Sequence, residues 1–127
     1  MNLNPANQIS LFGHHDKFIN FKQLYKNKKL PNKILLSGKK GIGKSTLAYH
    51  IINFILSINE DFPYDDKNFK INPENRSFKL VLNKSNPNFI SIDIDADKKN
   101  IDITQIRNLI LTLNKSSFNS KPRFVLI

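Results

Sequence analysis

A glycine-rich stretch that ends in a lysine and two hydroxyl residues is the part of this sequence best suited to do chemistry. It has the spacing G-x-x-x-x-G-K-[ST], with Gly38, Gly43, Lys44 and Ser45 at the fixed positions. Glycines permit positive φ angles and let backbone N–H groups approach an anion closely. A helix that begins at the same point directs its positive dipole end toward that anion. The stretch therefore predicts a loop that binds nucleotide phosphates.

The residues of this loop have different expected roles. The lysine, Lys44, places its charge on the β- and γ-phosphates of ATP, and the hydroxyl of Ser45 is the expected ligand for Mg²⁺. Lys39 and Lys40 fall in the variable part of the loop, so their charges are expected to be incidental. No catalytic residue is assigned. The predicted nucleotide-binding residues are Gly38, Lys39, Lys40, Gly41, Ile42, Gly43, Lys44, Ser45 and Thr46.

The residues on either side of the loop have the order that such a site requires. Residues 33–37 form a short apolar run, which predicts a strand. After the loop, apolar residues recur at helical spacing to about residue 58, which predicts a helix with one buried face. The buried positions expected on it are Leu47, Ile51, Phe54, Ile55 and Ile58. Strand, phosphate loop and helix in this order are typical of P-loop NTPases.

The segments before and after this unit are expected to alternate between helices and strands. Residues 16–28 have apolar side chains on one helical face, and the sequence Leu30-Pro31 ends that helix. Residues 59–85 lose the periodicity, which predicts a long surface insertion. Within it, a short helix from Pro73 to about residue 82 and a strand over 78–82 both remain open.

The last third of the chain predicts two parallel strands joined by a helix. The strands are residues 89–95 and 123–127. Asp102 and Gln105 form a capping-box pair that opens a helix running to about residue 113. Its expected buried face consists of Ile103, Ile106, Ile110 and Leu113.

Length and composition limit the classes of protein to consider. The chain has 127 residues, a net charge of +10 and no cysteine, so disulfides and thiolate metal sites are excluded. There is no apolar run of about 18 residues and no signal-peptide pattern, and a cytoplasmic protein is expected. The positive charge fits a nucleic-acid surface, but the chain favours residues with A/T-rich codons throughout, lysine among them, so genome composition explains the charge equally well.

Two groups of candidate metal ligands are set aside. Asp93, Asp95 and Asp97 resemble the start of a calcium loop, but that loop needs glycine where Lys98 stands and glutamate where Thr104 stands. The adjacent His14 and His15 are interpreted as a surface pair at a helix start. Asp93 also ends the apolar part of a strand, as a Walker B acid does, yet Ser91 interrupts that run and residues 124–127 are the more apolar strand. The Walker B acid is therefore expected after Ile127.

The order of these pieces resembles the AAA+ clamp-loader subunits of bacterial DNA polymerase III, and most of all the delta-prime type. Leu11-Phe12-Gly13-His14 is similar to the family's L-x-G-H entry, and Asn86-Pro87-Asn88 to its His-Pro-Asp segment. The stretch from Ile101 to Leu109 resembles the I-x-I-D-x-I-R-x-L helix start, and residues 122–127 resemble the Walker B strand. The resemblance covers the chain except residues 59–76. The four-cysteine zinc module of many clamp-loader subunits is missing here.

The resemblance implies an α/β fold: a P-loop NTPase of AAA+ type, with a parallel sheet and flanking helices, incomplete at the C-terminus. Residues 1–127 are then the N-terminal part of a nucleotide-binding domain. Its expected divisions are an entry segment and helix (1–32), a strand, phosphate loop and helix (33–58), an insertion (59–85), and a strand, helix and strand (86–127). The sheet order 5-1-4-3-2 would leave strand 33–37 without neighbours, so the chain alone is expected to be marginally stable.

The function implied by the resemblance is that of an ATP- and Mg²⁺-binding subunit that helps load a sliding clamp onto primed DNA. Its partners would be the other clamp-loader subunits and, through the assembled complex, the clamp and the DNA. Whether ATP is hydrolysed stays open. The alternatives are the clamp-loader ATPase subunit, a stand-alone P-loop ATPase or kinase, and a plain DNA-binding module. An arginine-rich lid, which a kinase would need, is not evident because Arg76, Arg107 and Arg123 are scattered.

Overall fold

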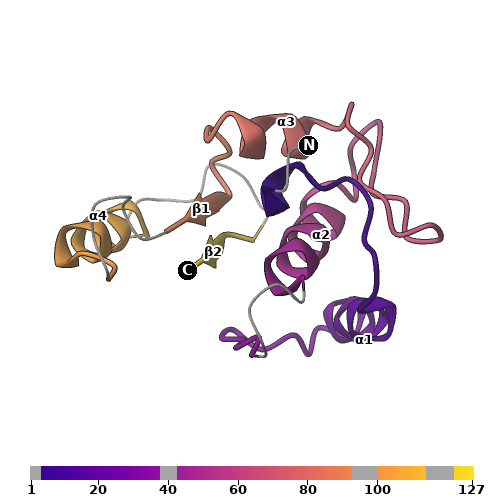
Figure 1. Cartoon of the computed structure of the whole chain (residues 1–127), viewed down its shortest axis with the longest axis horizontal. Helices are drawn as coiled ribbons and strands as arrows, with labels where there is room; N and C mark the ends of the chain where they lie inside the picture. The colour runs from indigo at the N-terminus through magenta and orange to yellow at the C-terminus, as the bar shows by residue number, and fades with distance from the viewer. Residues whose placement is uncertain (1–3, 38–42, 93–99, 114–121) are drawn as a thin grey trace.

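The computed structural model describes residues 4–37, 43–92, 100–113 and 122–127. Its elements, in chain order, are η1 (Pro5–Asn7), α1 (His15–Lys26), α2 (Lys44–Leu56), α3 (Arg76–Leu82), β1 (Phe89–Ser91), α4 (Ile103–Leu113) and β2 (Phe124–Leu126). In the described part, four α-helices accompany a two-stranded parallel sheet. Figure 1 shows α2 between α1 on one side and η1 and α3 on the other, with α4 at the far end beyond the strands.

Helix α2 is the centre of the hydrophobic core. Nine of its 13 residues are buried, because helices or loops cover it on several sides. Leu47, Ile51, Phe54 and Ile55 lie in the core cluster, which confirms the predicted apolar stripe. Ile58 lies beyond the end of the helix and is 45% exposed, so its predicted burial is wrong.

The parallel sheet has the pairing expected from the sequence. Phe89 of β1 pairs with Phe124 of β2, and the register continues to Ser91 and Leu126. The N–H of Phe124 donates to the carbonyl oxygen of Asn88 at 2.7 Å. The buried side chain of Asn88 also donates to the carbonyl oxygen of Pro122 at 3.2 Å. The second asparagine of the Asn-Pro-Asn turn therefore joins the starts of both strands.

Residues 33–37 do not form the predicted strand. They have no assigned secondary structure, and the side chains of Ile34 and Leu35 are 47% and 89% exposed. A strand requires a neighbour that pairs with its N–H and C=O groups. Among the described residues no strand pairs with this segment, since β1 and β2 pair only with each other.

Helix α4 has the predicted start but not the predicted burial. The side chain of Gln105 accepts a hydrogen bond from the N–H of Asp102 at 2.8 Å, and Asp102 accepts one from the N–H of Thr104 at 3.1 Å. These bonds confirm the capping pair. Ile103 and Ile110, however, are 62% and 52% exposed, and Ile106 is half-buried. The predicted buried face is wrong because no described element packs extensively against α4; the side chain of Leu113 lies outside the described part.

The segment 59–85 is part of the core rather than a surface insertion. Tyr64, Ile71 and Phe78 are buried in the same cluster as α2. The helical alternative for its second half is confirmed, with α3 beginning at Arg76, and the strand alternative is wrong. Irregularly spaced apolar residues gave no periodic signal for this burial.

A buried pair of asparagines fixes α3 to α2. The side-chain amides of Asn53 and Asn75 donate to each other's oxygens at 3.2 and 3.0 Å. Asn75 is also the N-cap of α3, because its side-chain oxygen accepts from the N–H of Phe78 at 2.7 Å. The side chain of Asn75 therefore caps α3 and also forms hydrogen bonds with the buried side chain of Asn53.

Two residues after the end of α1, a lysine occupies a backbone position that is usually glycine. Lys28 has a φ of 56°, and the N–H of Lys29 bonds the carbonyl oxygen of Leu24 at 2.8 Å, as in a Schellman motif. A side chain in this left-handed conformation costs about 1 kcal/mol relative to glycine. We expect Lys28→Gly to raise the free energy of unfolding by about that amount in urea titrations.

Two controls separate the backbone effect from the loss of charge. Lys28→Ala removes the same charge but keeps the strain, so it should not stabilise the protein. Lys29→Gly changes the neighbouring position, where φ is not positive, and should destabilise it slightly. Equal stability of Lys28→Gly and Lys28→Ala would contradict the strain argument.

Candidate functional site

The first turn of α2 has the features of an anion-binding helix terminus. Gly43 precedes the helix with a φ of 84°, which confirms the need for glycine there. The first turn contains no acidic residue, and the N-cap residue, Gly43, has no side chain with which to cap it. N–H groups at such a terminus and the helix dipole both favour an anion. Lys44 is half-buried and Ser45 is exposed at this terminus.

The structure describes only part of the predicted phosphate site. Gly43, Lys44, Ser45 and Thr46 lie together where α2 begins. The remaining predicted residues lie outside the described part of the chain, so their contribution stays a prediction. They are Gly38, Lys39, Lys40, Gly41 and Ile42.

The side chain of His14, which no sequence pattern places here, lies beside the start of α2. A methyl group on the Cα of Gly43 would lie 3.7 Å from Cδ2 and 3.8 Å from Nε2 of His14. An added methyl group would therefore be in van der Waals contact with the ring, so the imidazole of His14 faces the last glycine of the motif across the space that a methyl group would fill. The two residues are 29 positions apart, and no local pattern predicts their contact. His14 therefore belongs to the surroundings of the predicted site, and the interpretation as a surface pair missed this.

The neighbouring histidine points elsewhere. The Nε2 of His15 lies 2.7 Å from the carbonyl oxygen of Leu11, to which it donates. Its ring stacks on Phe69, with centroids 3.9 Å apart and planes 2° from parallel. Within the described residues no group of three or more potential metal-ligating side chains comes together. Asp93, Asp95 and Asp97, considered above as calcium or Walker B ligands, lie outside the described part.

A buried histidine joins α2 to two segments far away in the sequence. His50 is 0% exposed; its Nε2 lies 2.8 Å from the carbonyl oxygen of Gln8, and its Nδ1 lies 2.7 Å from the hydroxyl of Tyr64. Because a carbonyl oxygen can only accept, Nε2 carries the proton and Nδ1 accepts from the tyrosine. Burial lowers the pKa of His50. Burial, together with Asp65 and Asp66, raises the pKa of Tyr64. Both groups are therefore neutral, and their role is structural.

A groove in the described part lies at the other end of α2. Its volume is about 480 Å³, and its lining includes Leu56, Glu60 and Asn88. A helix of 13 residues is about 20 Å long, so the groove is well separated from Lys44. Glu60 accepts hydrogen bonds from the N–H and hydroxyl of Ser77 and thus serves the start of α3. The groove is not part of the predicted phosphate site.

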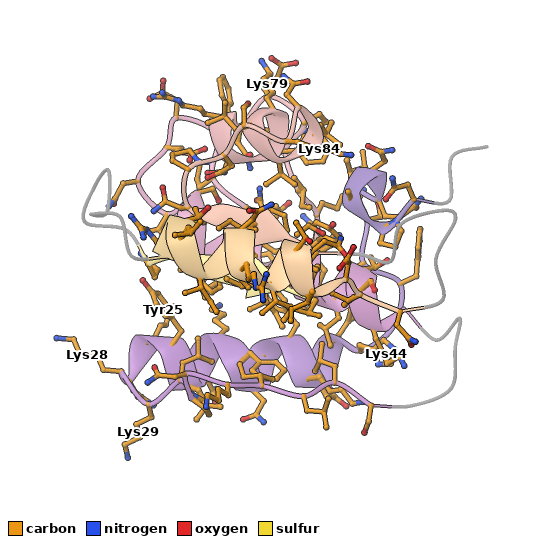
Figure 2. The ribbon with its side chains drawn as sticks, turned by 90° about the vertical axis from the view of Figure 1, so that its left-hand side faces the viewer. Tyr25, Lys28, Lys29, Lys44, Lys79 and Lys84 are labelled. Carbon is orange, nitrogen blue, oxygen red and sulfur yellow. The ribbon has the colours of Figure 1, made fainter. Side chains whose placement is uncertain are left out.

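The lysines labelled in Figure 2 are distributed over several elements. Lys28 and Lys29 extend from the end of α1, whereas Lys79 and Lys84 lie at α3 and Lys44 lies at the start of α2. The labelled lysines do not form one continuous patch in this view.

Comparison with known proteins gives a family. A family model described as "DNA polymerase III, delta subunit" matches residues 13–127, which is most of the chain. The searches of curated proteins and of solved structures each gave no match. Throughout the described ranges, no helix has the length and apolar character needed to cross a membrane. The family match agrees with the resemblance seen in the sequence, and the chain belongs to the DNA polymerase III delta-subunit family of clamp-loader proteins, which act in DNA replication.

Proposed function

We propose that this protein is an ATP-binding, delta-prime-like subunit of the clamp loader. The observation that carries the proposal is the start of α2, where Gly43, Lys44 and Ser45 meet at a helix terminus whose N-cap is a glycine and whose first turn has no acidic residue. This arrangement suits a polyphosphate and a bound Mg²⁺. The match of residues 13–127 to the family supports the role in clamp loading.

We assign to this chain the AAA+ form of the P-loop NTPase fold. ATP would contact the nine residues of the motif, and Ser45 would be the Mg²⁺ ligand. The partners would be the other clamp-loader subunits, with the sliding clamp and primed DNA bound through the assembled complex in the cytoplasm. The parallel pairing of β1 and β2 across a helix is compatible with this fold.

The decisive experiment compares two lysines of the motif. Lys44→Ala should weaken ATP binding by about 2 kcal/mol, or about 30-fold in Kd, because a charge-assisted contact to phosphate is lost. Lys39→Ala should have a much smaller effect, since that position belongs to the variable part of the loop. Isothermal titration calorimetry with ATP and Mg²⁺ measures both. Equal losses in the two variants would contradict the assigned roles.

The metal dependence gives a second prediction. We expect Ser45→Ala to lose most of the gain in ATP affinity that Mg²⁺ provides, because the hydroxyl is the expected ligand of the ion. Binding of ATP without metal should persist in this variant. Titrations with Mg²⁺ and with EDTA measure the difference. A variant whose affinity responds to Mg²⁺ as the wild type does would exclude Ser45 as the ligand.

A further inference from the structure

The segment before α1 is held in place by the segment that follows α2. Residues 8–14, here called the strap, run antiparallel to residues 69–71. The N–H of Leu11 donates to the carbonyl oxygen of Phe69 at 3.0 Å, and the N–H of Ile71 donates to that of Ile9 at 2.8 Å. His50 fixes the other end of the strap through the carbonyl oxygen of Gln8. The strap therefore has a defined path over the core.

The last residue of the strap, His14, lies beside the start of α2. Gly13 and His14 both have left-handed φ angles, 83° and 57°, and α1 begins immediately after them. This sharp change of direction brings His14 against Gly43, as described above. A shift of the strap would therefore move the imidazole that lies on the last glycine of the phosphate motif.

Phe69 contacts both the strap and the start of α1, which follows it directly. Its ring stacks on His15, its edge meets Phe18 at a centroid distance of 5.7 Å, and its carbonyl oxygen accepts from Leu11. The backbone of Phe69 has a φ of 55°, a conformation that is strained for an aromatic residue. The stacked ring offsets this strain. His15, held by the stack, is the chain neighbour of His14.

We propose that Phe69 is a positioning residue for the nucleotide site: through the stack on His15 and the strap, it sets His14 against Gly43. The segment after α2 thereby controls the geometry at the start of that same helix. This inference rests on the proposed nucleotide binding at Lys44 and Ser45. It does not require Phe69 to touch the nucleotide.

The test compares ATP–Mg²⁺ affinity in matched variants of the full-length protein. Phe69→Leu keeps an apolar side chain but removes the flat ring, and its Kd should rise about 3-fold to 30-fold, the range for coupling between distant residues. Phe69→Tyr retains the ring and should bind as the wild type does. Phe62→Leu, at a half-exposed position of the same segment, is the control and should also be unaffected. Should Phe69→Leu fail to fold, His15→Ala removes the same stack from an exposed position and should give the same loss.

A second measurement separates this inference from the proposed function. In the ligand-free protein, NMR signals of the His14 ring and the Gly43 amide should shift in Phe69→Leu and in His15→Ala but not in Phe62→Leu. If the wild type binds no ATP, the proposed function fails, and these signals alone decide whether Phe69 positions His14. Unchanged signals would overturn the inference, as would unchanged ATP affinity in Phe69→Leu and His15→Ala when the wild type binds.

Discussion

Phe18→Ala should lower the free energy of unfolding by about 3–5 kcal/mol, the usual cost of removing a buried aromatic side chain. Phe18 is 1% exposed and is the buried residue of α1. Its ring lies 5.1 Å from that of Tyr64, and 5.7 Å from the rings of Phe54 and Phe69. One side chain therefore joins α1 to α2 and to the segment after it. Urea unfolding followed by circular dichroism measures the loss.

Two further variants show whether the effect comes from this aromatic cluster. Phe18→Leu keeps most of the apolar volume and should cost much less than alanine, because a smaller cavity remains. Ile19→Ala removes the next side chain in α1, which is 41% exposed, and should cost less than 1 kcal/mol. A similar loss for Phe18→Ala and Ile19→Ala would show that the cluster does not dominate the stability of the protein.

The elements that repeat a local pattern were predictable from the sequence. Helices α1, α2 and α4 follow from apolar spacing, and the start of α4 follows from Asp102 and Gln105, whose side chains bond as a capping pair should. The parallel pairing of residues 89–91 with 124–126 follows from two apolar runs separated by a helix. In each case the information lies within one segment or its immediate neighbours.

The features that the sequence did not predict depend on contacts between distant segments. Tyr64 and Ile71 are buried because the strap and α2 cover them, and neither residue belongs to a periodic run. The exposure of Ile34 and Ile110 depends in turn on what lies beside them. Burial is a property of the neighbours as much as of the residue, so an apolar pattern alone cannot establish it.

The candidate site also has one part that a local pattern predicted and another that depends on distant contacts. The motif predicted Gly43, Lys44 and Ser45 at the start of a helix, and the structure places them there. The contact of His14 with Gly43 was missed because it depends on the path of residues 8–14 over the core. Only the fold, and not a local sequence pattern, brings His14 to the motif.

Replacement of the buried histidine of α2 is the second change expected to lower the free energy of unfolding strongly. His50→Ala should lower the free energy of unfolding by about 3 kcal/mol, because it leaves the hydroxyl of Tyr64 and the carbonyl oxygen of Gln8 without their partner and opens a cavity. His50→Gln is the matched control, since glutamine can also donate one hydrogen bond and accept another. It should retain more of the stability than alanine does in the same urea titrations. Equal losses would show that the two hydrogen bonds contribute little.

The pH dependence of stability tests the protonation state of His50 independently. Burial lowers its pKa in the folded protein, so the unfolded chain binds a proton first as the pH falls below about 6.5. The contribution of the neutral His50 to the free energy of unfolding is therefore complete above that pH. Below it, this contribution decreases by at most about 1.4 kcal/mol per pH unit. Carboxyl groups also titrate toward acid, so the informative quantity is the difference between the wild type and His50→Gln, which lacks the titrating ring. This difference should be flat above pH 6.5 and should shrink as the pH is lowered. A difference that stays constant down to pH 5 would mean that His50 takes up a proton in the folded protein as readily as in the unfolded chain. In that case Nδ1 would donate to the hydroxyl of Tyr64, while Nε2 would still donate to the carbonyl oxygen of Gln8.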